Sequence, residues 1–455
     1  MPYTNLRFVG YSIDTAPKAI PGGSSTDLGL PIAAQDIEAR CILMQKAMNT
    51  AYDQLPPASP PEAPGTTLTV FLAPEFYLRG VTGAYQMDDV QLAITMLQDM
   101  AADPKWTDWV FGFGTILGNS DVPRKWYDFF GLFQKQEVYN FCLFQQGGDQ
   151  AKGPDGAQVI MKELMSRIDF ISSRANPGGL LLGSVQHMEP SNPSGTGRES
   201  SQVAYDGAGI FTACGITWAL DICLDHLSDR LQRSPQLPGE EKVRVQLVPS
   251  CGAYFNPDDL MAAPGGFLFN VDGHNGSFAK LYDVPTSPPA PPIAPPRNFP
   301  VSNAPYPLPD TSPLVTVTPN QLYRAGAGKV VIFAPLPIPA PETVPGFPIT
   351  LHWNASPNYS FTFKLIYDGK NKFRTVLCQV RSTEVNFNNN NYFVPLNLRT
   401  LDRNMNTVSI SAKLTKGAPT FDYALWCEIH VGDFNFVGNV VEFSATPSGP
   451  IKVCY

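Results

Sequence analysis

The stretch Gly209–Asp225, GIFTACGITWALDICLD, is a long apolar run that ends in a cysteine between two acids. β-Branched and aromatic residues dominate the run, which predicts a buried strand. Cys223 follows directly and is flanked by Asp221 and Asp225. A strand fixes the backbone and a turn exposes the side chain, so this arrangement can hold a sulfur nucleophile rigidly at a sheet edge. Cys223 is therefore the first candidate for a catalytic residue.

The composition is that of a globular protein with a sizeable core. The chain has 455 residues, of which 43% are hydrophobic and 16% charged, and its net charge is -8. No run is rich in Lys or Arg, so neither nucleic acid nor a membrane surface is an expected partner. The N-terminal residues lack the pattern of a signal peptide, and no apolar window is long enough to cross a membrane. We therefore expect a cytoplasmic protein.

The eight cysteines are scattered and form no CxxC pair. In a chain of this length without a secretion signal, that usage predicts reduced thiols, most of them buried. Cys223 and His226 could form a metal pair or a protease dyad, but a zinc site needs three or four ligands and no second cluster exists. We expect no metal and no cofactor.

Apolar strands alternate with helical patterns through the first 280 residues or so. Residues 34–54 and 88–102 carry apolar residues at helical spacing, and each lies between runs that predict strands. This alternation is typical of layered α/β folds. The expected strands are 4–13, 67–76, 109–118, 138–146, the run before Cys223, 243–255 and 265–273.

Two later regions differ in composition from this pattern. Residues 284–312 hold many prolines and predict a loop or linker in extended conformation. From residue 341 onwards the chain consists of short alternating runs broken by Asn, Gly, Asp and Pro, which predicts a C-terminal all-β sandwich over 341–455.

Three polar residues follow expected strands and could act together. Glu75 ends the strand in FLAPEF, Lys162 lies after the GPDG turn, and Cys223 follows the apolar run. A thiol must lose its proton to attack a carbonyl or nitrile carbon, and a carboxylate can accept that proton. A lysine beside both would stabilise the negative charge of the tetrahedral intermediate. The three side chains together predict an amide-hydrolysing site.

These motifs resemble those of the nitrilase superfamily of carbon–nitrogen hydrolases. FLAPEF resembles the family's strand-then-PE motif around its glutamate, and DICLD resembles its motif around the cysteine. Further similarity lies in VYNFCLFQQ (138–146), VQLVPSCGAY (245–254) and LYRAGAGKVVIFAPLP (322–337). The interval between Lys162 and Cys223 is longer than is usual in the family, and Leu224 replaces the usual aromatic residue. The motifs therefore indicate the chemistry better than the substrate.

The resemblance implies a four-layer αββα sandwich over residues 1–340, with the Pro-rich segment 284–312 as an insertion within it. It also implies a catalytic triad of Glu75 as base, Lys162 at the oxyanion and Cys223 as nucleophile. Many family members have a second glutamate before the cysteine. Glu199, 24 residues before Cys223, is the best match, and Glu189 is the alternative.

The first functional hypothesis is an amidase that cleaves a non-peptide C–N bond through a thioester. A nitrilase acting on a nitrile is the second, and an inactive binding or scaffold protein is the third. The expected partner is a small amide or nitrile substrate, and the resemblance implies a possible homodimer. Asp225, at the start of the helix after Cys223, is expected to interact with the helix dipole.

Overall fold

The structure is a computed structural model. Its described residues are 3–19, 25–55, 64–121, 136–149, 156–164, 166, 168–169, 185–187, 209–228, 230–231, 241–255, 260–274, 278–286, 292–309 and 311–343. In the C-terminal part it describes the backbone of eight strands. The chain divides into two compact units. The first comprises 1–199, 207–230 and 243–340, and the second 200–206, 231–242 and 341–455.

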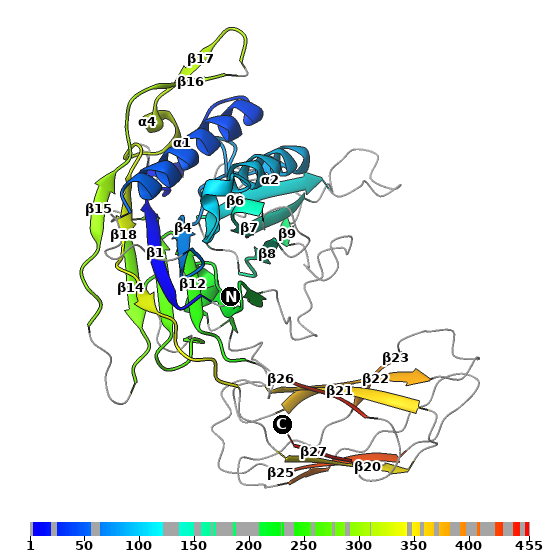
Figure 1. Cartoon of the computed structure of the whole chain (residues 1–455). Coiled ribbons are helices and arrows are strands. Elements are labelled where there is room, and N and C mark those ends of the chain that lie inside the picture. The colour runs from blue at the N-terminus through cyan, green and yellow to red at the C-terminus, as the bar shows by residue number, and fades with distance from the viewer. Residues whose placement is uncertain are drawn as a thin grey trace, which may run out of the picture. The chain divides into compact units, whose positions relative to one another are not determined.

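A ten-stranded mixed sheet forms the centre of the first unit (Figure 1). Its main path runs β15-β18-β1-β4-β6-β7-β8, and the β1–β4–β6 core is parallel. Three short strands join it at the side, with β19 on β1, β5 on β6 and β9 on β7. The bounds are β1 Asn5–Ser12, β4 Thr67–Leu72, β5 Tyr85–Gln86, β6 Trp109–Asp121, β7 Gln136–Gln146, β8 Ala157–Met161, β9 Val185–His187, β15 Arg297–Pro300, β18 Lys329–Ile332 and β19 Leu336–Pro337.

A second sheet has five strands in the order β10-β11-β12-β13-β14. Its central strands β11, β12 and β13 are parallel, and its two edge strands are antiparallel to their neighbours. The bounds are β10 Ile210–Ala213, β11 Ile216–Leu220, β12 Val245–Ser250, β13 Phe267–Asp272 and β14 Phe278–Asp283.

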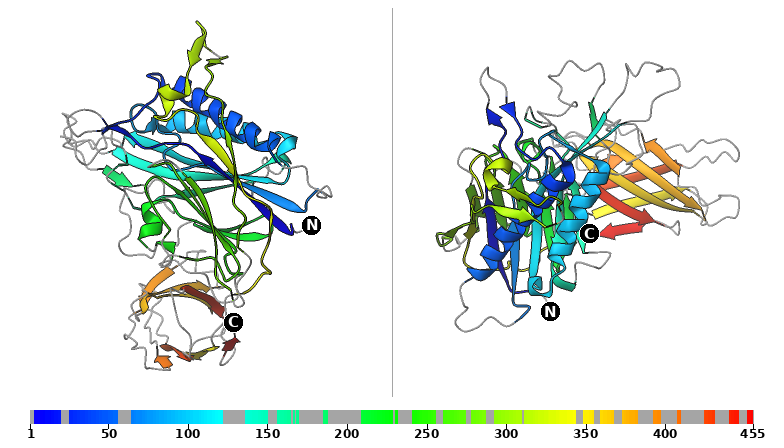
Figure 2. Two further views of the ribbon diagram at one scale, coloured as in Figure 1. Left: turned by 90° about the vertical axis from the view of Figure 1, so that its left-hand side faces the viewer. Right: turned by 90° about the horizontal axis from the view of Figure 1, so that it is seen from above.

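Helices and the second sheet bury opposite faces of the ten-stranded sheet. The helices α1 (Ala33–Asp53) and α2 (Met87–Ala101) lie side by side along one face (Figures 1 and 2). Along β1, Val9 and Tyr11 join the core beneath the helices, whereas Phe8 joins the core shared with β11, β12 and β13. This alternation is the two-residue period of a strand with both faces buried. The result is an α–β–β arrangement.

The expected mixed α/β class is confirmed, as are the two helices predicted at 34–54 and 88–102. The fourth layer stays a prediction. Among the described residues, the helix that follows β11 is the short α3 (Leu224–Leu227). In the part of the chain that is described, no helix is long and apolar enough to span a membrane.

Gly10 marks the closest approach of the two sheets. A Cβ atom built on Gly10 would overlap Ala279 Cβ of β14 and would lie 3.2 Å from Val271 Cγ2 of β13. Contacts this short cannot be accommodated in a close-packed interior without a shift. The glycine therefore sets the spacing between β1 and the second sheet.

The long apolar run before Cys223 is not one strand, contrary to the expectation from sequence. It is a β-hairpin of β10 and β11 in which Ala213 pairs with Ile216. Cys214 and Gly215 form the turn with φ of 54° and 70°, and positive φ at both positions is what a two-residue type I′ turn requires. The strand that leads to the candidate nucleophile is thus the five-residue β11.

The Pro-rich segment also differs from the expected loop. Arg297–Pro300 forms β15, which pairs with β18 at the edge of the ten-stranded sheet, and residues further on form β16 (Tyr306–Leu308). β16 pairs with β17 (Val315–Val317), and α4 (Pro319–Leu322) follows. Proline is tolerated in β15 because an edge strand leaves one row of N–H groups unpaired.

In the C-terminal part, the described residues lie in strands that form two four-stranded sheets. Their orders are β24-β25-β20-β27 and β23-β22-β21-β26. The sandwich arrangement of these sheets stays a prediction. The bounds are β20 Pro348–Asn354, β21 Tyr359–Tyr367, β22 Phe373–Ser382, β23 Tyr392–Leu396, β24 Thr407–Ser409, β25 Ala424–His430, β26 Val440–Ala445 and β27 Ile451–Cys454.

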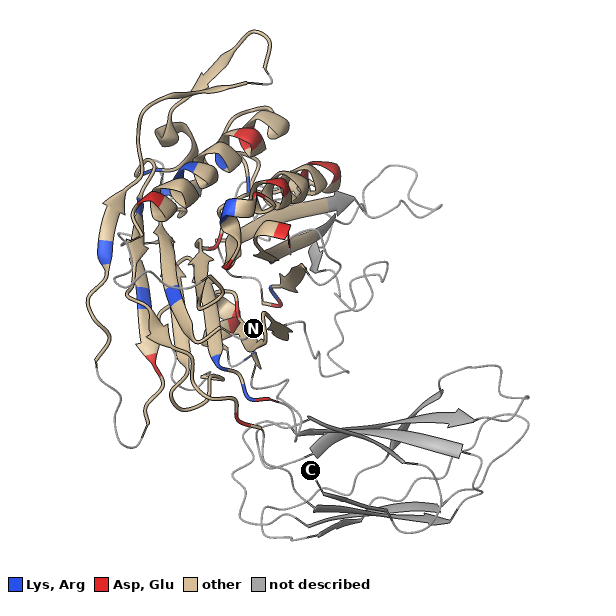
Figure 3. Ribbon diagram, viewed as in Figure 1, with Lys and Arg blue, Asp and Glu red and all other residues tan. Residues whose placement is uncertain are grey.

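Lys and Arg residues are spread over several strands and helices of the first unit (Figure 3). Many of the buried ones take part in specific ion pairs, such as Arg40 with Asp36 and Arg79 with Asp27.

Candidate active site

Cys223 lies on a tight turn between β11 and α3. Its backbone has φ of 49°, a value that is unusual for a non-glycine residue. The Cys223 N–H donates to Pro249 O at 3.1 Å, and the thiol lies 4.0 Å from Cys251 O. The side chain is 5% exposed. Strained backbone of this kind costs on the order of 1–3 kcal/mol and tends to occur at functional sites.

Glu75 follows β4 and is fully buried. The next residue, Phe76, has φ of 63°, so this turn is also strained. Oε1 of Glu75 accepts a hydrogen bond from Asn140 Nδ2 at 3.0 Å, and the backbone carbonyl of Glu75 accepts one from Thr15 Oγ1 at 2.6 Å. Oε2 is buried and accepts no hydrogen bond of ordinary geometry from the described residues. One carboxylate oxygen is thus held in place and the other remains available.

Lys162 begins the segment after β8 and is 1% exposed. Its backbone N–H donates to Asn140 O at 2.7 Å, which continues the pairing of β8 with β7. Its ammonium Nζ lies 2.8 Å from Glu75 Oε1. Asn140 thus holds both Glu75, through its side chain, and Lys162, through its backbone.

Asp169 is a second carboxylate on Lys162 that the sequence analysis did not identify. Its Oδ2 and Oδ1 lie 2.8 and 3.1 Å from Lys162 Nζ. Ser166 orients Asp169 by donating from its backbone N–H at 3.0 Å and from its hydroxyl at 2.6 Å. The ammonium group is therefore held between two buried acids.

The electrostatics of the three predicted residues are coupled. Burial raises the pKa of Glu75, with Lys162 lowering it and Asp169 raising it. Burial also raises the pKa of the Cys223 thiol well above its ordinary value, as does the charge of Glu75, whereas Lys162 lowers it. For Lys162, burial opposes the charge, but Glu75, Asp169 and Cys223 outweigh this and raise its pKa well above the usual range.

These shifts describe a site with two carboxylates and one ammonium, and so with an excess negative charge at full ionisation. The excess charge disfavours a resting thiolate. The raised pKa of Cys223 therefore favours the thiol form, beside the Glu75 carboxylate.

Asp225, two residues after Cys223, binds backbone N–H groups that lie outside its own helix. Its Oδ2 accepts the Glu163 N–H at 2.8 Å, and its Oδ1 accepts the Leu164 N–H at 2.7 Å. These are the two residues directly after Lys162. The turn that carries Cys223 is thus bonded to the segment that carries Lys162.

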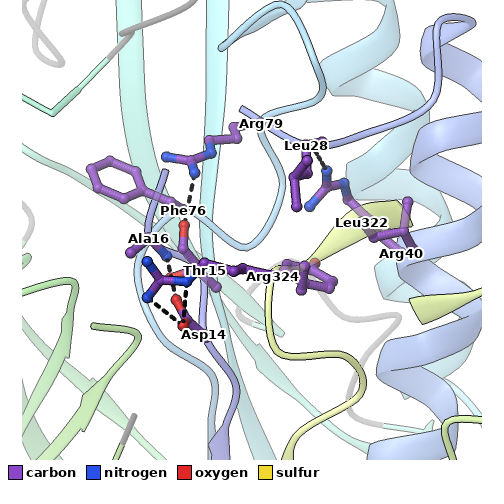
Figure 4. A pocket seen from close by; sticks show the side chains of 10 residues that line it. Asp14, Thr15, Ala16, Leu28, Arg40, Phe76, Arg79, Leu322 and Arg324 are labelled. Carbon is purple, nitrogen blue, oxygen red and sulfur yellow. Dashed lines mark hydrogen bonds and ion pairs between the residues drawn. The ribbon is translucent and has the colours of Figure 1, made fainter. Parts of the chain in front are cut away.

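Two cations lie near the ring of Phe76. Lys162 Nζ is 5.7 Å and Arg79 Cζ is 5.1 Å from the ring centroid, distances at which a ring attracts a cation. Phe76, Arg79 and Thr15 also line a small polar pocket with room for about one water molecule (Figure 4). The pocket is connected to the triad through Phe76 and through the Thr15 hydroxyl.

The structure brings Glu75, Lys162 and Cys223 together at the same end of their strands. Glu199 and its alternative Glu189 lie outside the described residues, so the accessory role stays a prediction. The sequence could have indicated Asn140 as a site residue, because a single amide in the apolar run VYNFCLF needs a buried hydrogen-bond partner. The indication for Asp169 is weaker. It is an acid beside the apolar Ile168, a few residues after the candidate lysine.

Among the described residues, no group of three or more His, Cys, Asp or Glu side chains is arranged to hold a metal ion. Neither a protein-family model nor a curated protein matches the sequence.

Solved structures do match. One is an amidase from Nesterenkonia sp., with a TM-score of 0.32 and 11% identity, covering 74% of this chain and 92% of the amidase. The protein is similar to amidases of the nitrilase superfamily. A cysteine-to-serine variant of the Nesterenkonia AN1 amidase, described as from the nitrilase superfamily, matches at a TM-score of 0.31 and 9% identity, over 73% and 91% of the two chains.

A third match is a cysteine-to-alanine variant of the Nesterenkonia sp. AN1 amidase in complex with butyramide. Its TM-score is 0.32 and its identity 10%, with coverage of 73% and 92% of the two chains. The assignment of function rests on the geometry of the site itself.

Proposed function

We propose that the protein is a carbon–nitrogen hydrolase of the amidase type, with Cys223 as nucleophile. The observation that carries the proposal is the meeting of three groups. Lys162 Nζ lies 2.8 Å from Glu75, and the Cys223 thiol is close enough to Glu75 for the carboxylate charge to raise the pKa of the thiol. Nucleophile, base and oxyanion partner are the parts that acyl transfer needs.

In the first half-reaction, Glu75 accepts the proton of the Cys223 thiol while the sulfur attacks the amide carbon. The negative charge then develops on the amide oxygen, where the Lys162 ammonium stabilises it. Glu75 returns the proton to the departing nitrogen, and ammonia or an amine leaves. The acyl group remains on Cys223 as a thioester.

In the second half-reaction, a water molecule attacks the thioester carbonyl. Glu75, which is again a carboxylate, accepts a proton from this water. Collapse of the intermediate releases the carboxylic acid and restores the thiol. The raised pKa of Glu75 suits both duties, because a higher pKa makes the carboxylate a stronger base and lets the carboxyl group hold the proton until the leaving nitrogen takes it.

Asp169 has a supporting role in this proposal. By binding the Lys162 ammonium together with Glu75, it keeps that group protonated and aimed at one position. The role of Glu199 in placing substrate or water remains part of the proposal, as do the boundaries of the hydrolase region at residues 1–340.

The test is turnover of small amides and nitriles by the full chain and by Cys223→Ala. Butyramide and acrylamide are suitable first substrates, with ammonia and carboxylic acid as the measured products. We expect the variant to lose turnover completely, whereas Cys214→Ala, which removes a half-buried thiol on the β10–β11 turn, should retain it. Undiminished turnover by Cys223→Ala would overturn the proposal.

Two other outcomes are informative. Turnover of nitriles but not amides would assign the protein as a nitrilase with the same nucleophile. Labelling with fluoroacetamide, whose carbon–fluorine bond reacts poorly with ordinary thiols, separates an enzyme from a scaffold. We expect mass spectrometry to find the label on Cys223 and not on Cys214, which lies on the β10–β11 turn and donates to Gln146 Oε1 instead of facing Glu75. An unlabelled Cys223 would favour the binding or scaffold hypothesis.

A further inference from the structure

Asp225 joins two parts of the site that are far apart in sequence. It lies in the first turn of α3 and is fully buried. Its two carboxylate oxygens accept the N–H groups of Glu163 and Leu164 at 2.8 and 2.7 Å. Hydrogen bonds from backbone N–H groups to a carboxylate are stronger than neutral ones. This pair of bonds therefore fixes the peptide segment immediately after Lys162.

The segment that Asp225 holds lies beyond the end of β8. β8 ends at Met161, one residue before Lys162, so the ladder with β7 stops at the catalytic lysine. Beyond Lys162, the two hydrogen bonds to Asp225 attach the chain to the turn that carries Cys223. Any drift of this segment would move the Lys162 side chain relative to Cys223.

One cation accompanies Asp225. Arg230 Nε lies 3.7 Å from Asp225 Oδ2 and 3.5 Å from Glu163 Oε2, so it bridges the same two segments from the side. Burial raises the pKa of Asp225 to about 7, although Arg230, the Glu163 N–H and the charge of Lys162 each lower it. Asp225 is thus electrically part of the triad's surroundings.

We propose that Asp225 is a positioning residue that sets the distance between the Lys162 ammonium and the Cys223 thiol by binding the two peptide N–H groups after Lys162. It touches neither the thiol nor the ammonium. Its effect is on the transition state, in which the lysine must lie within hydrogen-bond reach of the oxyanion while the sulfur attacks. This inference rests on the proposed function for its kinetic consequence, whereas the structural bond can be measured without any turnover.

Asp221 provides a matched control. It lies two residues before Cys223, as Asp225 lies two residues after it, and both are fully buried. Asp221 also faces Arg230, at 3.9 Å, and accepts a hydrogen bond from Gln246 Nε2 at 3.2 Å. None of the contacts of Asp221 described here involves the residues after Lys162. The two variants Asp225→Asn and Asp221→Asn therefore remove the same charge on opposite sides of the nucleophile.

The first measurement is hydrogen exchange of the full chain, followed by mass spectrometry of a peptide that spans residues 161–166. In Asp225→Asn the side-chain amide presents one acceptor where the carboxylate presented two. We expect faster exchange of this peptide in Asp225→Asn than in the wild type, and unchanged exchange in Asp221→Asn. Equal exchange in all three proteins would overturn the proposal, and it would do so whether or not the protein is an amidase.

The second measurement is steady-state hydrolysis of the best amide from the panel. A small misplacement of a catalytic group can reduce a rate by about 10²-fold, so we expect kcat of Asp225→Asn to fall by about 10- to 100-fold with KM changed little. A smaller fall is expected for Asp221→Asn. Faster exchange with unchanged kcat would refute the positioning role, whereas a wild-type chain without turnover, with exchange as expected, would refute the proposed function alone.

Discussion

Glu75 acts on Cys223 in two opposite ways. It is the proposed base for the thiol proton, yet its charge also raises the pKa of that thiol. A single substitution can separate the two effects, because removal of the charge favours the thiolate and removal of the base stops catalysis.

For Glu75→Gln we expect hydrolysis to fall by about 10²- to 10⁴-fold, the usual contribution of a general base. Alkylation of Cys223 by iodoacetamide should become faster at a given pH, because the loss of the negative charge lowers the thiol pKa. The rate of label incorporation between pH 6 and pH 9, in steps of about one unit, measures this. Slower alkylation in the variant would show that Glu75 activates the thiol in the resting enzyme.

Asp169→Asn tests the second acid on Lys162. The charge of Asp169 raises the pKa of Glu75, so its loss should lower that pKa and shift the acid limb of the kcat/KM profile to lower pH. The maximum rate should fall by about 10- to 100-fold because the ammonium loses a partner that aims it. A profile shifted to higher pH would contradict the assigned charge of Asp169.

The sequence predicted Glu75, Lys162 and Cys223 but not their surroundings. Each of the three follows an apolar strand, so a local pattern identifies it. Asp169 becomes part of the site through the fold of the segment after Lys162, and no periodicity in SRIDF reveals that contact. Asn140 lies between these cases, since a lone amide in an apolar strand indicates a buried partner without naming it.

At the scale of elements, the spacing of the two sheets depends on Gly10, which has no side chain. A methyl group on Gly10 of β1 would overlap Ala279 of β14. Overpacking of a close-packed interior costs about 1–3 kcal/mol. Both residues lie in the first unit, and the site groups follow strands of both sheets.

We therefore expect Gly10→Ala to lower the free energy of unfolding of the first unit by about 1–3 kcal/mol. The double variant Gly10→Ala/Ala279→Gly should recover most of the loss, because the second substitution removes the overlapping atom. Denaturant unfolding followed by tryptophan fluorescence compares the three proteins. A double variant no more stable than the single one would show that the strain comes from another contact.

Two elements were mispredicted for reasons that are visible in the structure. The run before Cys223 has an uninterrupted apolar composition, but Gly215 permits the positive φ at which β10 turns into β11. The segment 284–312 has the composition of a linker, but an edge strand needs half of the hydrogen bonds of a central strand, so Pro300 can end β15. In the first case a local turn divided the run into two paired strands, and in the second case pairing with the distant strand β18 outweighed the local composition.

At the scale of the whole molecule, the chain's last strand in the first unit is β19, which pairs with β1. The short alternating runs in the sequence after this strand predicted a separate C-terminal domain from residue 341. Those runs form strands, but their sequence does not indicate what the C-terminal sheets contact or bind.

A chain that ends at Ala340 should keep the first unit folded, because it retains β19 and the bond from Ile338 N–H to Thr4 O at 2.8 Å. We expect a cooperative thermal transition by circular dichroism and labelling of Cys223 by fluoroacetamide, as in the full chain. A shortened protein that is unfolded when expressed would mean that residues 341–455 are part of the folding unit.

The placement of Lys162 between two acids has a consequence for the lifetime of such an enzyme. When an acylated cysteine lies next to a neutral amine, the acyl group can migrate from sulfur to nitrogen. This reaction would leave a permanent amide on the lysine and end turnover. Even an ordinary lysine is neutral in roughly one molecule in a few thousand at pH 7, and Glu75 and Asp169 raise the pKa of Lys162 further. Without a lone pair the nitrogen cannot attack, so the two carboxylates protect the catalyst from self-acylation.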